Sequence, residues 1–118
     1  MSIFIIAVLI ISTSSFTNNI PDQKPGNDKR IEVVFNRQLD FNDLVKIKMD
    51  LSQKGITINY TSLAFDEAGH LEAIRFFVDC HDGFSGSAGE VNLSNQSRVG
   101  FYRDYTPGTK LPFGTGGI

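Results

Sequence analysis

One amphipathic helix, predicted over residues 41–54, most constrains the fold of this chain. Its apolar residues recur at steps of three and four, which gathers them on one face of a helix. Asp40 is a favourable N-cap, and Gly55 stands directly after the segment, where a helix commonly ends. Such a face must be buried against another element. The residues expected on it are Phe41, Leu44, Ile47 and Leu51, with Val45 at its margin.

The segments around this helix alternate apolar and polar residues, as half-buried strands do. "RIEVVFN" predicts a strand at 31–36, and "ITINYTSLAF" and "HLEAIRFFVDC" predict two strands joined by a hairpin loop at 66–69. The apolar parity changes near Thr61 and Ser62, which predicts a bulge there. The face expected to point into the core carries Ile74, Phe76, Val78 and Cys80.

This order of elements predicts an α+β domain over residues 30–118. We expect a small antiparallel or mixed sheet of three to five strands with the helix packed on one face, and a right-handed crossover through the helix. Candidate strands at 90–93 and 98–103 would extend the sheet. Residues from about 106 onward show no periodicity and are expected to form an irregular tail.

The N-terminal residues predict export. Residues 3–11 form an unbroken apolar run of nine, whereas a membrane-spanning helix needs about 20 residues. With the small residues at 12–15, the run fits a secretory signal, so we expect residues 1–16 to be a signal peptide and 17–29 a linker. No Lys or Arg precedes the run, which leaves a short uncleaved anchor, or the end of a truncated membrane helix, as alternatives. The expected location is periplasmic or extracellular, and an uncleaved segment would tether the protein to the membrane.

The charge balance excludes some partners. The chain has 11 basic and 13 acidic residues and a net charge of −2. A nucleic-acid binder would show a basic stripe, and binding to an anionic membrane would need a polybasic run. We therefore expect a protein or a cell-envelope component as partner, with membrane contact only through an uncleaved N-terminal segment.

The stretch "VDCHDGFSGSAGEVNL" gathers the residues that most suggest chemistry. Cys80, His81 and Asp82 are possible metal ligands, and a thiol beside an imidazole suggests a catalytic pair. Consecutive residues of an extended chain point to alternate sides, however, and no second His/Cys cluster stands at metal-ligand spacing. We expect Cys80 to be a buried, inert thiol and predict no catalytic residue, no metal and no cofactor. An enzyme or metal-dependent factor centred on these three residues is the alternative.

The glycine-rich part of that stretch resembles catalytic loops only superficially. "GFSGSAG" lacks the second Gly of a nucleophile elbow and the Lys of a phosphate-binding loop. Clusters of Gly and Ser between periodic segments are usually loops. We therefore predict a mobile loop at 81–90 that links two strands.

A recognition surface is the remaining functional candidate. "GFYRDY" interleaves aromatic residues with an arginine, a combination enriched at protein interfaces. The predicted partner surface comprises Phe84, Tyr102, Arg103 and Tyr105. The alternative is that Phe101 belongs to the core while Arg103 and Asp104 form a solvated pair.

Three segments carry a family resemblance: "KGITINYTSLAFDEAGHL", "DGFSGSA" and "FYRDY". From about Arg30 onward the chain resembles a small extracytoplasmic domain of the Bacteroidota. That domain follows the last membrane helix of membrane zinc peptidases related to beta-lactam-sensing antirepressor receptors. The resemblance implies a sensing or protein-interaction role. The H-E-x-x-H motif of the peptidase part does not occur in this sequence, so no catalytic residue carries over. A free-standing exported copy and a truncated remnant both fit.

Overall fold

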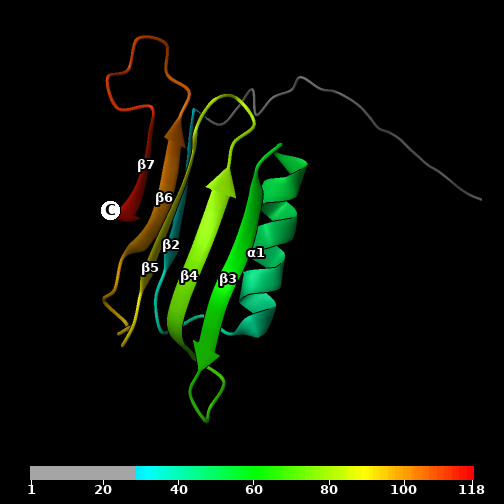
Figure 1. Cartoon of the computed structure of the whole chain (residues 1–118), viewed down its shortest axis with the longest axis vertical. Helices are drawn as coiled ribbons and strands as arrows, with labels where there is room; N and C mark the ends of the chain where they lie inside the picture. The colour runs from blue at the N-terminus through cyan, green and yellow to red at the C-terminus, as the bar shows by residue number, and fades with distance from the viewer. Residues whose placement is uncertain (1–28) are drawn as a thin grey trace, which may run out of the picture.

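The computed structural model describes residues 29–118, which form two three-stranded antiparallel sheets and one α-helix (Figure 1). One sheet has the strand order β2-β6-β7 and the other β3-β4-β5. The predicted signal peptide and nearly all of the predicted linker lie outside the described residues. In chain order the elements are β2 (Arg30–Phe35), α1 (Phe41–Gln53), β3 (Thr57–Phe65), β4 (Leu71–Asp79), β5 (Ser85–Glu90), β6 (Val99–Asp104) and β7 (Phe113–Gly117).

One helix with six strands is compatible with the α+β class, but the single sheet is wrong. The strands on either side of α1, β2 and β3, lie in different sheets, so the helix is not a crossover within one sheet. β2 pairs instead with β6, which brings Phe35 opposite Val99 and Val33 opposite Phe101. That pairing places the apolar face of β2 in the same core cluster as the apolar face of β6.

The helix begins and ends where its caps predict. The Asp43 N–H donates to Oδ1 of Asp40 (2.9 Å) and the Asp40 N–H donates to Oδ2 of Asp43 (3.0 Å), so the capping box is complete. Gly55 follows the C-cap with φ +84°, a conformation that costs other residues energy. The helix is held to β3 because the Tyr60 hydroxyl donates to the Leu44 carbonyl at 2.7 Å.

Only part of the predicted apolar face of α1 is buried. Leu44 and Leu51 are buried in the core, whereas Phe41 is 57% exposed and Val45 is 39% exposed. The apolar periodicity located the helix correctly but overstated the width of its packed face.

The predicted hairpin with its loop at 66–69 is confirmed. The Asp66 N–H donates to the His70 carbonyl at 2.9 Å across the turn between β3 and β4. The register shifts between Tyr60 and Ser62, at the predicted bulge. The expected inward face of β4 is buried: Ile74, Phe76, Val78 and Cys80.

The hydrophobic core draws on both sheets and the helix. The ring of Phe35, from β2, lies 5.3 Å from the ring of Phe76, from β4. Phe101, from β6, is fully buried with them. Figure 1 shows α1 beside β3, with β7 and the C-terminus at the other side of the molecule.

Two segments predicted to be irregular are strands. Residues 85–90 form β5 rather than a mobile loop, and the predicted irregular tail contains β7. The strand expected at 90–93 is wrong, because β5 ends at Glu90. Small side chains suit β5 because it lies close to β7: the Thr115 hydroxyl donates to the Ser87 carbonyl at 3.2 Å. A Cβ on Gly86 would lie 3.3 Å from the Thr115 methyl group. Packing against a neighbouring strand therefore overrides the loop tendency of Gly and Ser.

Candidate binding surface

Cys80, the first of the predicted chemical candidates, lies in the turn between β4 and β5. Its N–H donates to the Phe84 carbonyl at 2.9 Å, which closes the hairpin. The side chain is only 6% exposed. Burial, together with the neighbouring charge of Asp82, raises the pKa of the Cys80 thiol to about 11. The thiolate, which is the nucleophilic form, is therefore scarce at neutral pH.

The two neighbours of Cys80 are engaged elsewhere. Nε2 of His81 lies 2.8 Å from the Thr57 hydroxyl on β3, and Nδ1 lies 3.7 Å from Oδ2 of Asp79. Asp82 forms an ion pair with Arg103 on β6, at 2.8 Å. Cys80, His81 and Asp82 therefore contact three different partners. Among residues 29–118, no group of three His, Cys, Asp or Glu side chains could hold a metal ion.

Arg103 joins the hairpin to the other sheet. Its guanidinium lies over the ring of Phe84 (4.6 Å to the centroid) and over the ring of Tyr105 (4.4 Å). The same group donates to the carbonyls of Asp104 (2.7 Å) and Pro112 (3.2 Å), and the side chain is 12% exposed. Because its donors and both aromatic contacts are internal, Arg103 is a structural residue here. The predicted alternative of a solvated Arg103–Asp104 pair is also wrong.

The structure divides the predicted partner surface. Phe84, Arg103 and Tyr105 lie together, but Tyr102 is on the opposite face of its sheet because successive residues of β6 alternate. Phe101 is buried, as the predicted alternative had it. Of the four predicted surface residues, Tyr102 lines a pocket that is open to solvent.

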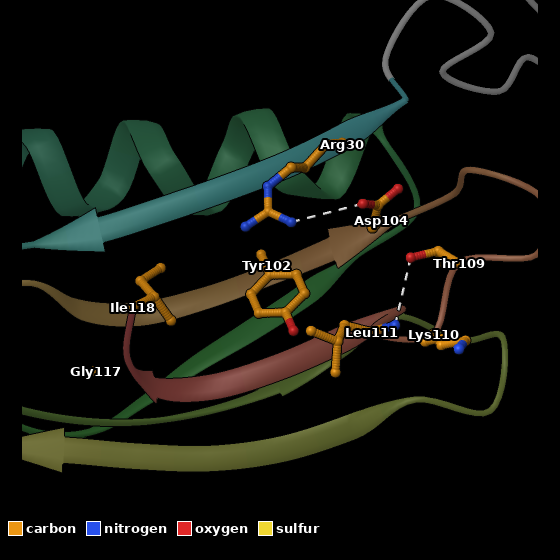
Figure 2. A pocket seen from close by; sticks show the side chains of 8 residues that line it. All are labelled: Arg30, Tyr102, Asp104, Thr109, Lys110, Leu111, Gly117 and Ile118. Carbon is orange, nitrogen blue, oxygen red and sulfur yellow. Dashed lines mark hydrogen bonds and ion pairs between the residues drawn. The ribbon is translucent and has the colours of Figure 1, made fainter.

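The pocket around Tyr102, which we call the Tyr102 pocket, has a volume of about 560 Å³ and is open to solvent. The start of β2, the end of β6, the loop before β7 and the C-terminus all contribute to it (Figure 2). Its lining residues are Arg30, Tyr102, Asp104, Thr109, Lys110, Leu111, Gly117 and Ile118.

The position of the Tyr102 ring depends on a glycine in the neighbouring strand. A Cβ on Gly114, which is opposite Tyr102 in the β6–β7 pairing, would lie 2.6 Å from the ring, so only glycine lets the ring rest on β7. The Arg30 guanidinium lies over the same ring, 4.2 Å from its centroid. The ring is therefore held between two groups, which fixes one rim of the pocket.

The Tyr102 pocket combines charges of both signs with exposed apolar surface. Arg30 pairs with Glu32 (3.1 Å) and Asp104 (3.6 Å). The Thr106 backbone N–H, then its side chain and Arg30, hold the pKa of Asp104 below its ordinary value, so the carboxylate is charged at neutral pH. Leu111 is 69% exposed. These groups can bind a ligand by ion pairs, hydrogen bonds and apolar contact.

The sequence signal for this pocket was only partial. Tyr102 was found because it lies beside an arginine, but its true cationic neighbour is Arg30, more than 70 residues away in the chain. Lys110 and Leu111 belong to the segment expected to be an irregular tail. The alternation of β2 places Arg30 on the exposed side of its strand, but no sequence signal pairs β2 with β6 and so brings Arg30 to Tyr102.

A second hollow lies on α1. It has a volume of about 370 Å³ and is mainly apolar, and Met49 at its wall is 59% exposed. Its lining residues are Phe41, Leu44, Val45, Lys48, Met49, Ser52 and Tyr60. Within the described part of the chain, no helix is long and apolar enough to cross a membrane.

Comparison with known proteins adds no relative. No family model, no curated protein and no solved structure matches this chain. The arrangement of its own residues is therefore what bears on its function.

Proposed function

We propose that this protein is a non-enzymatic, exported binding module of the cell envelope and that it contacts its partner through the Tyr102 pocket. One observation carries the proposal: Cys80, His81 and Asp82 contact three separate partners and form no common site, while the Tyr102 pocket is open to solvent and presents both charge and exposed apolar surface. Cys80 is buried and Asp82 is paired with Arg103. Leu111 and Arg30, in contrast, present apolar surface and charge at the pocket.

The sequence supports the location. The nine-residue apolar run at 3–11 and the small residues after it have the form of a secretory signal. The resemblance to an extracytoplasmic domain of membrane zinc peptidases implies the same compartment and a sensing or interaction role. An uncleaved apolar segment would tether the same domain to the membrane.

Photocrosslinking in the native host tests this function. A benzoylphenylalanine placed at Leu111 should give a defined adduct with one envelope component. The matched control is the same probe at Glu67, in the exposed hairpin loop between β3 and β4. The Tyr102→Ala substitution should reduce the Leu111 adduct strongly. Fractionation of the same cells should place the protein in the envelope or outside the cell.

Two outcomes would count against the proposal. Adducts of equal yield at both probe positions, or an adduct at Leu111 that is indifferent to Tyr102→Ala, would show that the pocket is not the contact surface. Retention of the protein in the cytoplasm would exclude an envelope role.

A further inference from the structure

β2 is an edge strand of its sheet. The register shows which of its residues direct their backbone N–H and C=O groups toward β6. Antiparallel partners alternate between pairs that exchange hydrogen bonds and pairs that do not. The Tyr105 N–H donates to the Lys29 carbonyl at 2.7 Å, in the register that sets Arg30 opposite Asp104. The Asp104 N–H points the other way and donates to Pro112, beside β7, at 2.7 Å. The odd-numbered residues of β2 therefore bond to β6.

The even-numbered residues of β2 direct their backbone groups away from β6. These residues are Arg30, Glu32 and Val34, and they present three N–H and three C=O groups at the edge. Among residues 29–118, none of these six groups has a hydrogen-bond partner. A row of such groups is a template for pairing with another extended chain.

A groove runs beside this edge. Figure 2 shows α1 alongside β2 on the side away from β6. The groove between them has a volume of about 280 Å³. Its apolar walls are Ile31 and Val33 from β2 and Ile47 and Leu51 from α1, and its charged rim is Arg30, Glu32, Asp50 and Lys54.

We infer that the partner contributes an extended peptide segment, which pairs with the free edge of β2 and places alternate side chains in this groove. This inference rests on the proposed function and names the class of its partner. Main-chain hydrogen bonds supply affinity in such strand addition, and pockets for alternate side chains supply specificity. A strand rises about 3.3 Å per residue, so the six residues of β2 match a peptide of about six residues.

The alternation of a strand gives the peptide two faces. One set of side chains enters the groove, where Ile31, Val33 and Leu51 favour apolar residues. The other set lies over the outer face, where Arg30 and Glu32 favour opposite charges. Arg30 lines both the groove and the Tyr102 pocket, so one bound segment is continuous with both sites.

A second copy of this chain is a poorer occupant. Two apolar side chains of its β2 edge, Ile31 and Phe35, are already buried in its own core, so they are not available to enter the groove of the first copy. A single extended peptide has no core of its own, so all of its alternate side chains are available to enter the groove.

Amide hydrogen exchange of the full chain tests the edge directly. Ile31, Val33 and Phe35 should exchange slowly because they bond to β6, whereas the amides of Glu32 and Val34 should exchange fast. Slow exchange at the even-numbered positions of the free protein would mean that the chain itself or a second copy already covers the edge. That result would overturn the inference. Exchange that becomes slower as the protein concentration rises would indicate a second copy, and exchange that does not change would indicate the chain itself.

Peptide selection tests the partner class. The full chain is used to select from a displayed library of random octapeptides, and selected peptides should show apolar residues at alternate positions. A bound peptide should slow exchange at Glu32 and Val34. Selection of no peptide, or of peptides with helical apolar spacing, would overturn the inference.

A matched pair of substitutions separates backbone from side chain. Glu32→Pro removes an outward N–H without touching the β6 ladder, a place where proline is tolerated. It should weaken peptide binding roughly tenfold, whereas Glu32→Ala should weaken it less than about threefold. Equal effects of the two substitutions would refute backbone pairing. If Glu32→Pro does not fold, Val34→Pro with Val34→Ala provides the same comparison. A Leu111 crosslink that persists when these tests fail would leave the proposed function standing and refute this inference alone.

Discussion

Replacing Arg103 by methionine tests how strongly the β4–β5 hairpin is held to the second sheet. Methionine keeps an unbranched apolar side chain but removes the guanidinium. The variant loses the ion pair with Asp82, the contacts with the rings of Phe84 and Tyr105, and the hydrogen bonds to two backbone carbonyls.

The expected loss of stability follows from these contacts. Removing one partner of a buried ion pair costs about 3–5 kcal/mol, while a surface pair contributes about 0–1 kcal/mol. Arg103 is 12% exposed and Asp82 is 32% exposed, which places their pair between these limits. The two lost carbonyl hydrogen bonds and the two lost ring contacts add to the cost, although the Pro112 carbonyl keeps its hydrogen bond from the Asp104 N–H. We expect Arg103→Met to lower the free energy of unfolding by about 2–4 kcal/mol.

Urea unfolding followed by circular dichroism measures this loss, and Arg30→Met is the matched control. Arg30 also lies on an aromatic ring and pairs with carboxylates, but its side chain is 43% exposed. We expect its replacement to cost less than about 1 kcal/mol. Equal losses for the two variants, or a negligible loss for Arg103→Met, would refute the structural role given to Arg103.

Three further predictions concern the core, the pocket and the hairpin. Leu44→Ala should lower the free energy of unfolding by about 2–5 kcal/mol, but Val45→Ala on the exposed side of the helix by less than about 1 kcal/mol; similar losses would contradict the orientation of α1. Gly114→Ala should shift the NMR signals of the Tyr102 ring, whereas Gly117→Ala should not, because a Cβ at Gly117 meets open space. A shift in the Gly117 variant but not in the Gly114 variant would contradict the position of the ring. His81→Ala should leave folding intact, and the wild-type protein should purify without stoichiometric zinc; zinc bound to the wild type and lost in the variant would disprove the structural reading of the hairpin.

Local signals predicted the elements of this fold well. The helix could be placed from Asp40, Gly55 and the apolar spacing between them because caps and periodicity act within a few residues. The β3–β4 hairpin and its bulge were equally local, since adjacent strands joined by a short turn pair with each other. Strand order was not local: β2 pairs with β6, about 70 residues later, and nothing in the alternation of either strand names that partner.

The glycine-rich segments were mispredicted for a different reason. β5 and β7 consist mostly of small residues, which fit closely against neighbouring strands, so neither shows the apolar alternation by which strands are found. The same segments determine the candidate site. The bare backbone at Gly114 seats the ring of Tyr102, and the loop before β7 supplies Leu111. Arg30 and the pocket residues of the C-terminal segment meet only after β2 and β7 have both joined β6.

The central claim is that the hairpin residues around Cys80 hold the fold together rather than react, and thiol labelling of the native protein tests it most directly. A pKa of about 11 against the ordinary 9.0 leaves about a hundredfold less thiolate near neutral pH. We predict that a thiol-reactive disulfide labels Cys80 at least about a hundredfold more slowly in the native protein than in urea. The labelling rate of the native protein should keep rising with pH up to about 11. Labelling as fast in the native protein as in urea, with a rate already constant at pH 7, would contradict the account.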